Sequence, residues 1–416
     1  MFTPQTVLLV VFMFFTLVTV HEWGHFYFAK RAGILVREFA IGFGPKLFSF
    51  RRGETWYTLR LLPIGGFVRM AGEDPEVVFV RPGQTIAADL KDGCISRIYT
   101  DRLDERNAEL RGEAEEVDLE RELIIRLRIG DERRTYRVLP DAHVVVRGRQ
   151  IQIAPWNRQF GSKTVGQRAM AIAAGPMMNV LLAFVLFMAA VALAGIPERY
   201  RVHAVVGGGP AERAGLQAGD VILRIDGREV GYDFETLSEL IRNSNRPTVW
   251  EVLRDGSVRS LTVPPPGPDG RIGVELAPHG KRRATVGEVV EGGWNSLVGA
   301  TGRILEGFRL LLSGRFTLDD LTGPVGIVRV SGEQAAKGLP EYTFWFALLS
   351  LYLAVFNLLP FPALDGSRLM FLALEAIRGK PVDPSRESLV HFIGFAMLML
   401  LMLAVTYNDI LNLVRR

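Results

Sequence analysis

The chain contains 416 residues, of which 48% are hydrophobic and 23% are charged. This composition excludes a disordered chain or a collagen-like fibre, and it is too apolar for an ordinary soluble enzyme of this size. Lys and Arg number 49 against 45 Asp and Glu, with no basic block or aromatic-basic array, so no nucleic-acid partner is expected. The single cysteine, Cys94, excludes a disulfide within the chain and a cysteine-based zinc site, which leaves His, Asp and Glu as metal ligands.

Apolar residues concentrate in four segments, each close to the roughly 20 residues that a helix needs to cross a bilayer. These segments cover residues 6–29, 169–196, 342–364 and 389–407. The first has no basic stretch before it and no small-residue cleavage site, so we expect a retained span rather than a signal peptide. The sequence therefore predicts a polytopic α-helical membrane protein with four transmembrane helices.

Basic residues beside these segments predict the orientation of the chain. They follow the first segment at Lys30, Arg31, Arg37, Lys46, Arg51 and Arg52, and separate the third from the fourth at Arg378, Lys380 and Arg386. Both loops are expected in the cytoplasm. The N-terminus, the region between the second and third segments and the C-terminus then face outward, although Arg415 and Arg416 favour the opposite side weakly.

Two regions outside the apolar segments have patterns of their own. Residues 48–70 predict a β-hairpin, and the charged stretch that follows, to about Gln152, contains strand-like runs such as residues 123–129. The role of this β-rich insert is not evident from the sequence. Residues 201–278 combine a glycine-rich start, a helix at residues 234–242 and a hairpin turning at Asp255-Gly256, which predicts a compact α+β module.

The first apolar segment contains His21-Glu22-Trp23-Gly24-His25, a match to H-E-x-x-H. Histidines four residues apart lie on one face of a helix and can bind one zinc ion, with the glutamate beside them as general base. A chance match in an amphipathic helix is the alternative. Ionisable groups are costly inside a membrane and are functional by default there, so the sequence predicts a metal site with His21 and His25 as ligands and Glu22 as base.

A catalytic zinc needs a third protein ligand besides two histidines. Asp365 follows the third apolar segment, where Pro360 and Pro362 break the helix and can direct a carboxylate inward. An ordinary aspartate at a helix end is the alternative. His391 and Glu387 are further candidates near the fourth segment, less favoured because they adjoin a charged loop.

These motifs together resemble the site-2 intramembrane zinc metalloproteases, and above all the bacterial regulator-of-sigma-E protease branch. The resemblance rests on the H-E-x-x-H motif, on Gly175-Pro176-Met177-Met178-Asn179, and on Asn357-x-x-Pro360-x-Pro362-x-Leu364-Asp365-Gly366. It implies one zinc ion per chain held by His21, His25 and Asp365, with Glu22 as general base. It also implies a protein of the bacterial inner membrane that cuts membrane-anchored substrates, such as anti-sigma factors already shortened by another protease or remnant signal peptides.

Other residues of these motifs have weaker assignments. The hairpin resembles the membrane re-entrant β-loop of the family, and its Gly65, Gly66 and Phe67 are expected to hold an extended substrate by strand addition; a hairpin without substrate contact is the alternative. Asn357 is either a contact between helices or, as the resemblance favours, a substrate ligand. Gly175, Pro176, Asn179, Pro360 and Pro362 are expected to be structural, with the Asn179 amide satisfying a carbonyl freed by the proline.

The α+β module resembles a PDZ domain in the circularly permuted bacterial order, most clearly at residues 214–220. Residues 271–276, including Ile272, Gly273 and Val274, would supply its peptide-binding edge strand, with peptide C-termini as candidate ligands. A steric gate that excludes intact ectodomains is the alternative, and it is slightly favoured.

The predicted organisation of the chain has nine parts. They are a first transmembrane helix with H-E-x-x-H (1–30), a cytoplasmic or re-entrant β-hairpin (31–72), a cytoplasmic insert (73–165), a second transmembrane helix (166–197), a PDZ domain (198–280), amphipathic membrane-surface helices (281–340), a third transmembrane helix with the aspartate ligand (341–368), a cytoplasmic loop (369–387) and a fourth transmembrane helix with the C-terminus (388–416). A membrane adaptor with a structural zinc site is the competing functional class, although such a site needs no base at Glu22. A sporulation-type branch of the superfamily is disfavoured, since such members usually lack a PDZ module.

Overall fold

The computed structural model describes residues 3–73, 80–103, 108–146, 148–230, 234–242, 244–267, 271–313 and 322–414. The chain divides into two compact units. One unit combines Met1–Val185 with Leu297–Arg416, and the other is Leu186–Ser296. All residues of the candidate site lie in the first of these units.

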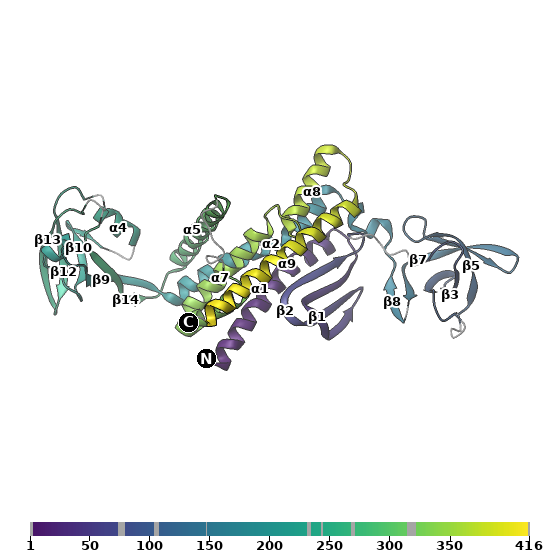
Figure 1. Ribbon diagram of the computed structural model, residues 1–416, viewed down its shortest axis with the longest axis horizontal. Helices are drawn as coiled ribbons and strands as arrows, with labels where there is room; N and C mark the ends of the chain where they lie inside the picture. The colour runs from purple at the N-terminus through teal and green to yellow at the C-terminus, as the bar shows by residue number, and fades with distance from the viewer. Residues whose placement is uncertain are drawn as a thin grey trace. The chain divides into compact units, whose positions relative to one another are not determined.

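Four helices of the described chain are long and apolar enough to cross a membrane, as the sequence predicts, and they mark a multi-pass membrane protein. They are α1 (Pro4–Arg31), α2 (Val165–Ala194), α7 (Leu339–Asn357) and α9 (Pro384–Val414). Buried polar contacts connect the first three: the Tyr342 hydroxyl donates to the Leu9 carbonyl at 2.8 Å, and the Ser350 hydroxyl donates to the Asn179 carbonyl at 2.8 Å. Figure 1 shows these helices running alongside one another within their unit.

The third apolar helix ends earlier than the predicted range 341–368. Helix α7 stops at Asn357, and a new helix, α8 (Asp365–Arg378), begins after a short loop. Pro360 and Pro362 explain the break, because proline has no N–H to donate and disfavours helical backbone at the residue before it. Asp365 therefore opens a helix instead of ending a span, and α8 occupies much of the predicted loop 369–387.

The predicted hairpin is present but strongly bent. Strands β1 (Val36–Arg52) and β2 (Thr55–Met70) meet at a two-residue turn, with Arg52 paired to Thr55. Residues 38–41 of β1 pair with two parts of β2, residues 66–69 and residues 56–59. Both long strands therefore bend and fold back within the same small sheet. Residues 66–70 have partners on one side only among the described residues, which leaves them as an edge of this sheet.

The turn of this sheet is fixed by ion pairs. Glu54 accepts hydrogen bonds from both guanidinium Nη atoms of Arg158 and one from Lys30 Nζ at 3.3 Å. The Arg158 hydrogen bonds, which outweigh partial burial, lower the pKa of Glu54 to about 2. A depressed carboxylate pKa stabilises the fold at all pH values above its unfolded value and loses this effect only toward pH 2, so the anchor persists at physiological pH.

The insert after this sheet has a hydrophobic core of its own. Its strands are β3 (Thr85–Lys91), β4 (Cys94–Tyr99), β5 (Leu110–Asp118), β6 (Ile124–Ile129), β7 (Glu132–Val146) and β8 (Arg149–Gln152). They follow the order β4-β3-β5-β6-β7-β8, and a parallel pairing of β4 with β7 closes the sheet on itself. Alternating apolar residues such as Ile86, Ile125 and Leu127 fill the interior. Two 3₁₀ helices, η2 (Trp156–Arg158) and η3 (Phe160–Ser162), lead into α2.

The second unit contains an α+β module. Its strands β9 (Ile196–Val205), β10 (Val221–Ile225), β12 (Thr248–Arg254), β13 (Ser257–Val263) and β14 (Val274–Arg282) form a sheet in the order β13-β12-β10-β9-β14, and β11 (Arg228–Glu229) pairs with β10. Helices α3 (Pro210–Arg213) and α4 (Phe234–Arg242) complete it. Trp250 is at the centre of the core, and Arg254 pairs with the fully buried Asp220 at 2.6 Å.

The edge strand of this module begins later than the predicted 271–276. Strand β14 starts at Val274, while Ile272 and Gly273 precede it. The Ile272 side chain lies in the core, and its carbonyl accepts the Ala211 N–H at 2.8 Å. The Gly273 carbonyl accepts the Val206 N–H at 2.8 Å. Of the three expected peptide-binding residues, only Val274 therefore belongs to the edge strand.

The predicted range of amphipathic helices, 281–340, contains α5 (Val286–Leu312) and α6 (Pro324–Lys337). Residues 324–327 form the first turn of α6. Asp409 of α9 accepts the N–H groups of Gly323 at 3.2 Å and Gly326 at 2.8 Å. These contacts satisfy helix N-terminal donors that have no partner within the helix.

Candidate metal centre

Helices α1 and α2 approach closely where the candidate ligands lie. A Cβ atom at Gly24 of α1 would overlap the Ala174 carbonyl of α2. A Cβ atom at Gly175 of α2 would overlap the imidazole of His25. The two glycines thus allow a contact between the helices that any larger side chain would prevent, and this contact fixes the His25 ring against α2.

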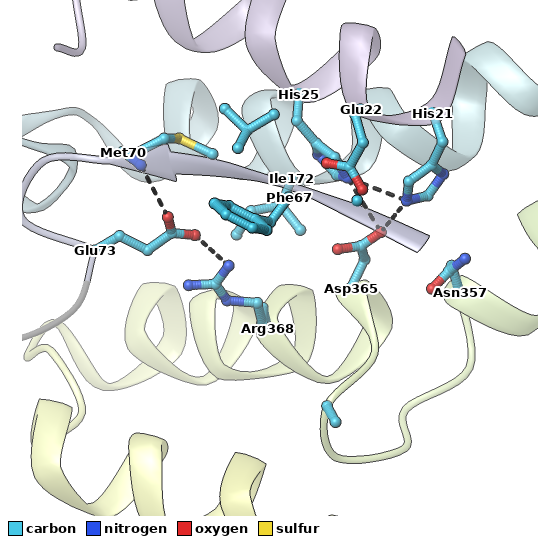
Figure 2. Close-up of a pocket in the computed structure, with 13 residues that line it drawn as sticks. His21, Glu22, His25, Phe67, Met70, Glu73, Ile172, Asn357, Asp365 and Arg368 are labelled. Carbon is cyan, nitrogen blue, oxygen red and sulfur yellow. Dashed lines mark hydrogen bonds and ion pairs between the residues drawn. The ribbon is translucent and has the colours of Figure 1, made fainter. Parts of the chain in front are cut away.

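His21, His25 and Asp365 meet at one point, although the first two are on α1 and the third opens α8 (Figure 2). The two Nε2 atoms are 3.2 Å apart. Asp365 Oδ2 lies 3.2 Å from His21 Nε2 and 3.4 Å from His25 Nε2. Both histidines are buried, so this cluster lies within the protein and not on its surface.

The ring nitrogens that point away from the cluster have partners on α2. His25 Nδ1 donates to the Ala171 carbonyl at 2.9 Å, which leaves a lone pair on the inward-facing Nε2. His21 Nδ1 lies 3.4 Å from Nδ2 of the fully buried Asn179. Asn179 therefore faces a histidine, and the prediction that its amide satisfies a carbonyl freed by Pro176 was wrong.

The cluster fits a zinc ion. Ligand bonds of about 2.0–2.1 Å in tetrahedral geometry place the ligand atoms roughly 3.3–3.4 Å apart, which matches the separations of 3.2, 3.2 and 3.4 Å. Asp365 Oδ2 is buried without a hydrogen bond from any described residue. A cation bound among the three residues would give this buried oxygen a partner.

A cavity of about 310 Å³ opens beside the cluster. It is lined by His21, Glu22, His25, Gly66, Phe67, Val68, Met70, Glu73, Ile172, Asn357, Ala363, Asp365 and Arg368. The histidines and Glu22 come from α1, the sheet residues from β2, and Asp365 and Arg368 from α8 (Figure 2). The candidate metal ligands, the candidate base and the edge of the β1–β2 sheet thus share one cavity.

Strand β2 passes directly over Glu22. A Cβ atom at Gly66 would lie 2.8 Å from Glu22 Cγ and 2.7 Å from the Ala40 carbonyl oxygen. Gly66 and Phe67 line the cavity, whereas Gly65 lies outside its lining and adopts a left-handed backbone with a φ of 72°. Two guanidinium groups contact the Phe67 ring, with Arg60 at 5.1 Å and Arg69 at 5.4 Å from its centre.

The two other charged residues of the cavity lining, Glu73 and Arg368, were not predicted from the sequence. Arg368 lies one turn after Asp365 on α8 and forms an ion pair with Glu73, which follows β2 (Figure 2). Glu73 Oε2 also accepts the Met70 N–H at 3.4 Å. The i,i+3 spacing from Asp365 was the available signal for Arg368, because residues three apart share a helix face.

The remaining predicted residues lie around the cavity with different partners. Asn357 lines it, and its Nδ2 donates to the Leu353 carbonyl at 2.9 Å. His391 and Glu387, the alternative ligands, are not part of the His21–His25–Asp365 cluster. His391 Nδ1 instead accepts the Ala363 N–H at 3.0 Å. Pro360 and Pro362 lie in the loop between α7 and α8.

Comparison with known proteins gives matches along nearly the whole chain. The model of peptidase family M50 matches residues 9–401. Zinc metalloprotease RasP of Oceanobacillus iheyensis is 41% identical over 424 residues, which cover 98% of this chain and 99% of that protein. Its namesake in Geobacillus kaustophilus is 43% identical over 417 residues, 98% of each chain. Regulator of sigma-W protease RasP of Bacillus subtilis is 42% identical over 417 residues, 98% of this chain and 99% of that protein.

Proposed function

Because the chain belongs to peptidase family M50, we propose that it is an intramembrane zinc metalloendopeptidase that cuts single-span membrane proteins. The observation that carries this proposal is the convergence of His21, His25 and Asp365 beside Glu22 in one cavity, with both histidines inside an apolar helix. One zinc ion per chain, held by these three residues, leaves a fourth position open for water or substrate.

The chain's own residues have distinct roles in the proposed reaction. Zinc, when bound, polarises the scissile carbonyl and lowers the pKa of water to about 7. Glu22 takes the proton of the attacking water and returns it to the leaving amine. The Ala171 carbonyl holds His25 in the tautomer that presents Nε2 to the metal, which keeps the ligand oriented through the reaction.

The β1–β2 sheet supports a role in holding the substrate. A transmembrane helix hides its carbonyls in hydrogen bonds, so the substrate must unwind before cleavage. The edge at residues 66–70 lies against Glu22 and the cavity, and its open side can pair with an extended strand. Gly66 and Phe67 are the proposed contacts of the main chain, and Asn357 is a proposed polar contact on the opposite wall.

The substrate class follows from the family and from the names of the relatives. The Bacillus subtilis relative is named a regulator of sigma-W protease, and we infer that this chain cuts trimmed anti-sigma factors of the same kind, with remnant signal peptides as a second class. The loops rich in Lys and Arg support a cytoplasmic location for the insert and an outward location for residues 198–280 in a bacterial cell membrane. The latter unit is proposed to be a PDZ domain, whose edge strand β14 either binds peptide ends or limits access.

A combined metal and cleavage assay tests the proposal. Detergent-purified wild type should contain about one zinc per chain and cut a model single-span substrate. Glu22→Gln should retain the zinc and lose cleavage, because the ligands are intact and the base is absent. Zinc without cleavage by the wild type on a pre-trimmed substrate would favour the adaptor function, and a wild type without zinc would overturn the proposal.

A further inference from the structure

We propose that His391 of α9 is a positioning residue that holds the loop carrying Asp365 in its ligand geometry. This inference rests on the proposed function, because the position of Asp365 matters through the proposed zinc site. It rests on three observations about the loop of residues 358–364 and the face of α9 that lies against it.

The first observation is a strained residue two positions before Asp365. Ala363 has a φ of 76°, in the left-handed region that residues other than glycine rarely adopt. Ala363 also lines the cavity. A non-glycine residue keeps such a conformation only where the surrounding structure enforces it, so an identifiable contact should hold Ala363 in place.

The second observation identifies this contact. His391 Nδ1 accepts the Ala363 N–H at 3.0 Å. An imidazole nitrogen that accepts has no proton, so the proton of the neutral ring is on Nε2. That nitrogen has no hydrogen bond within the described chain and lies 3.7 Å from Glu387 Oε1. The ring is thus held by the Ala363 backbone and by an edge contact with Phe371 of α8 at 5.9 Å between centroids.

The third observation is the close packing of the same face of α9. Gly394, one turn after His391, lies against Pro362, and a Cβ atom at this glycine would overlap Pro362. His391 and Gly394 are three residues apart and therefore share a helix face. One face of α9 thus touches the loop at Pro362 and Ala363, directly before the metal ligand.

Most of the apolar surface of α9 is not covered by other described residues of the chain. Only 11% of the most apolar stretch of the helix is buried within the chain. A histidine in such a helix is costly unless it has a function. Because Asp365 follows the loop immediately and points to His21 and His25 (Figure 2), a shift of the loop at Ala363 would move the carboxylate away from the zinc ligands.

Variants of His391 in the full-length, detergent-purified protein test this assignment. Asparagine places an amide atom where imidazole Nδ1 lies, glutamine places its amide nearer to Nε2, and leucine has neither acceptor. We expect His391→Leu and His391→Gln to lower zinc affinity and cleavage by about 10- to 100-fold, while His391→Asn stays within a few-fold of wild type. Zinc affinity is measured by competition with a chelator, and the visible spectrum of the cobalt-substituted protein reports ligand geometry.

Two further variants sharpen the test. Glycine adopts the backbone of residue 363 without strain, so His391→Leu should cost less in an Ala363→Gly background than in the wild type. Phe392→Leu changes the neighbouring, 69% exposed residue of α9 and should leave zinc affinity unchanged. Thermal unfolding and size-exclusion profiles verify that each variant is folded.

The outcomes separate the two proposals. The positioning role is overturned if His391→Leu binds zinc as tightly as wild type, or if the asparagine and glutamine variants lose equal affinity. In either case the proposed function stands as long as Asp365→Ala still loses zinc. If Asp365→Ala binds zinc as tightly as wild type, the ligand set of the proposed function is wrong and the positioning role fails with it. A graded series, with asparagine near wild type and an altered cobalt spectrum for leucine, supports the inference.

Discussion

Asn179 of α2 lies beside His21, one of the proposed metal ligands. Its amide nitrogen is 3.4 Å from His21 Nδ1, and its buried Oδ1 has no hydrogen-bond partner within the described residues. Amide oxygen and nitrogen are assigned from their partners. A histidine that binds a metal through Nε2 carries its proton on Nδ1, so the metal-bound protein should present Oδ1 to His21.

We therefore expect Asn179→Leu to weaken zinc binding by about 10- to 100-fold, because the Nδ1 proton of His21 loses its acceptor. Asn179→Asp keeps an acceptor of the same shape and should bind zinc within a few-fold of wild type. Competition with a chelator measures both affinities. Equal binding by the leucine variant and the wild type would show that the contact does not support His21.

Gly66 allows a second test at the scale of a single residue. An added Cβ would lie 2.8 Å from Glu22 Cγ, so Gly66→Ala should displace the base and lower kcat by about 100-fold. Zinc content should stay at the wild-type level, because the metal ligands are not touched. A control is Gly307→Ala in helix α5, where an added Cβ meets nothing within 4 Å and the backbone is not left-handed. Full activity in Gly66→Ala would remove β2 from the catalytic arrangement.

Residues that act through local motifs were predicted, and those that act through packing were not. His21, Glu22 and His25 share one helix turn, so their spacing alone defines the chemistry. Asp365 was selected by the ligand count and the two prolines, without evidence of its distance from α1. The Asn179 contact with His21 depends on how α1 packs on α2, and the strained backbone of Ala363 depends on α9; neither leaves a pattern in the sequence.

At the scale of elements, β2 and α8 are joined by the ion pair of Glu73 and Arg368. Both side chains are largely buried and line the cavity. We expect Glu73→Gln and Arg368→Gln each to destabilise the protein by about 1–3 kcal/mol, because each leaves a partly buried charge without its partner. The double variant should cost little more than either single one. Thermal or denaturant unfolding of the three variants measures this coupling, and strictly additive losses would contradict it.

Several elements were predicted from their periodicity, with errors where the chain bends. The four apolar helices match the hydropathy of the sequence. The break at Pro360 and Pro362 was predicted, but the new helix that begins at Asp365 was not, because the third apolar segment was expected to extend to residue 368. The pairing of residues 38–41 with two parts of β2 was also missed. Alternation of apolar and polar residues indicates a strand, but it does not indicate how the strand folds back. The parallel β4–β7 pairing of the insert depends on contacts remote in sequence.

At the scale of the whole molecule, the resemblance to site-2 proteases is confirmed by the family match over residues 9–401. The resemblance rests on several motifs, which lie on elements from the first apolar helix to α8. One motif alone would not have identified the family. The assignment of the α+β module as a PDZ domain and the orientation of the chain remain predictions.

Zinc should stabilise the unit that contains the proposed site, because the proposed ligands join α1 to α8. A ligand that binds only the folded state adds about 4 kcal/mol when its free concentration is 1,000 times its Kd. We expect a chelator to lower the melting temperature of wild type and of Glu22→Gln alike, and added zinc to reverse the change. Asp365→Ala should melt at the same temperature with and without chelator. A chelator that leaves the wild-type melting temperature unchanged would contradict this linkage.

The distribution of the ligands along the chain has a consequence for biosynthesis. His21 and His25 are near the beginning of the chain, whereas Asp365 and the helix α9 that packs on its loop are near the end. A nascent chain inserted as far as its second apolar helix contains the proposed base and two proposed ligands but lacks Asp365. On the proposed ligand assignment, a chain without α8 should therefore have no proteolytic activity.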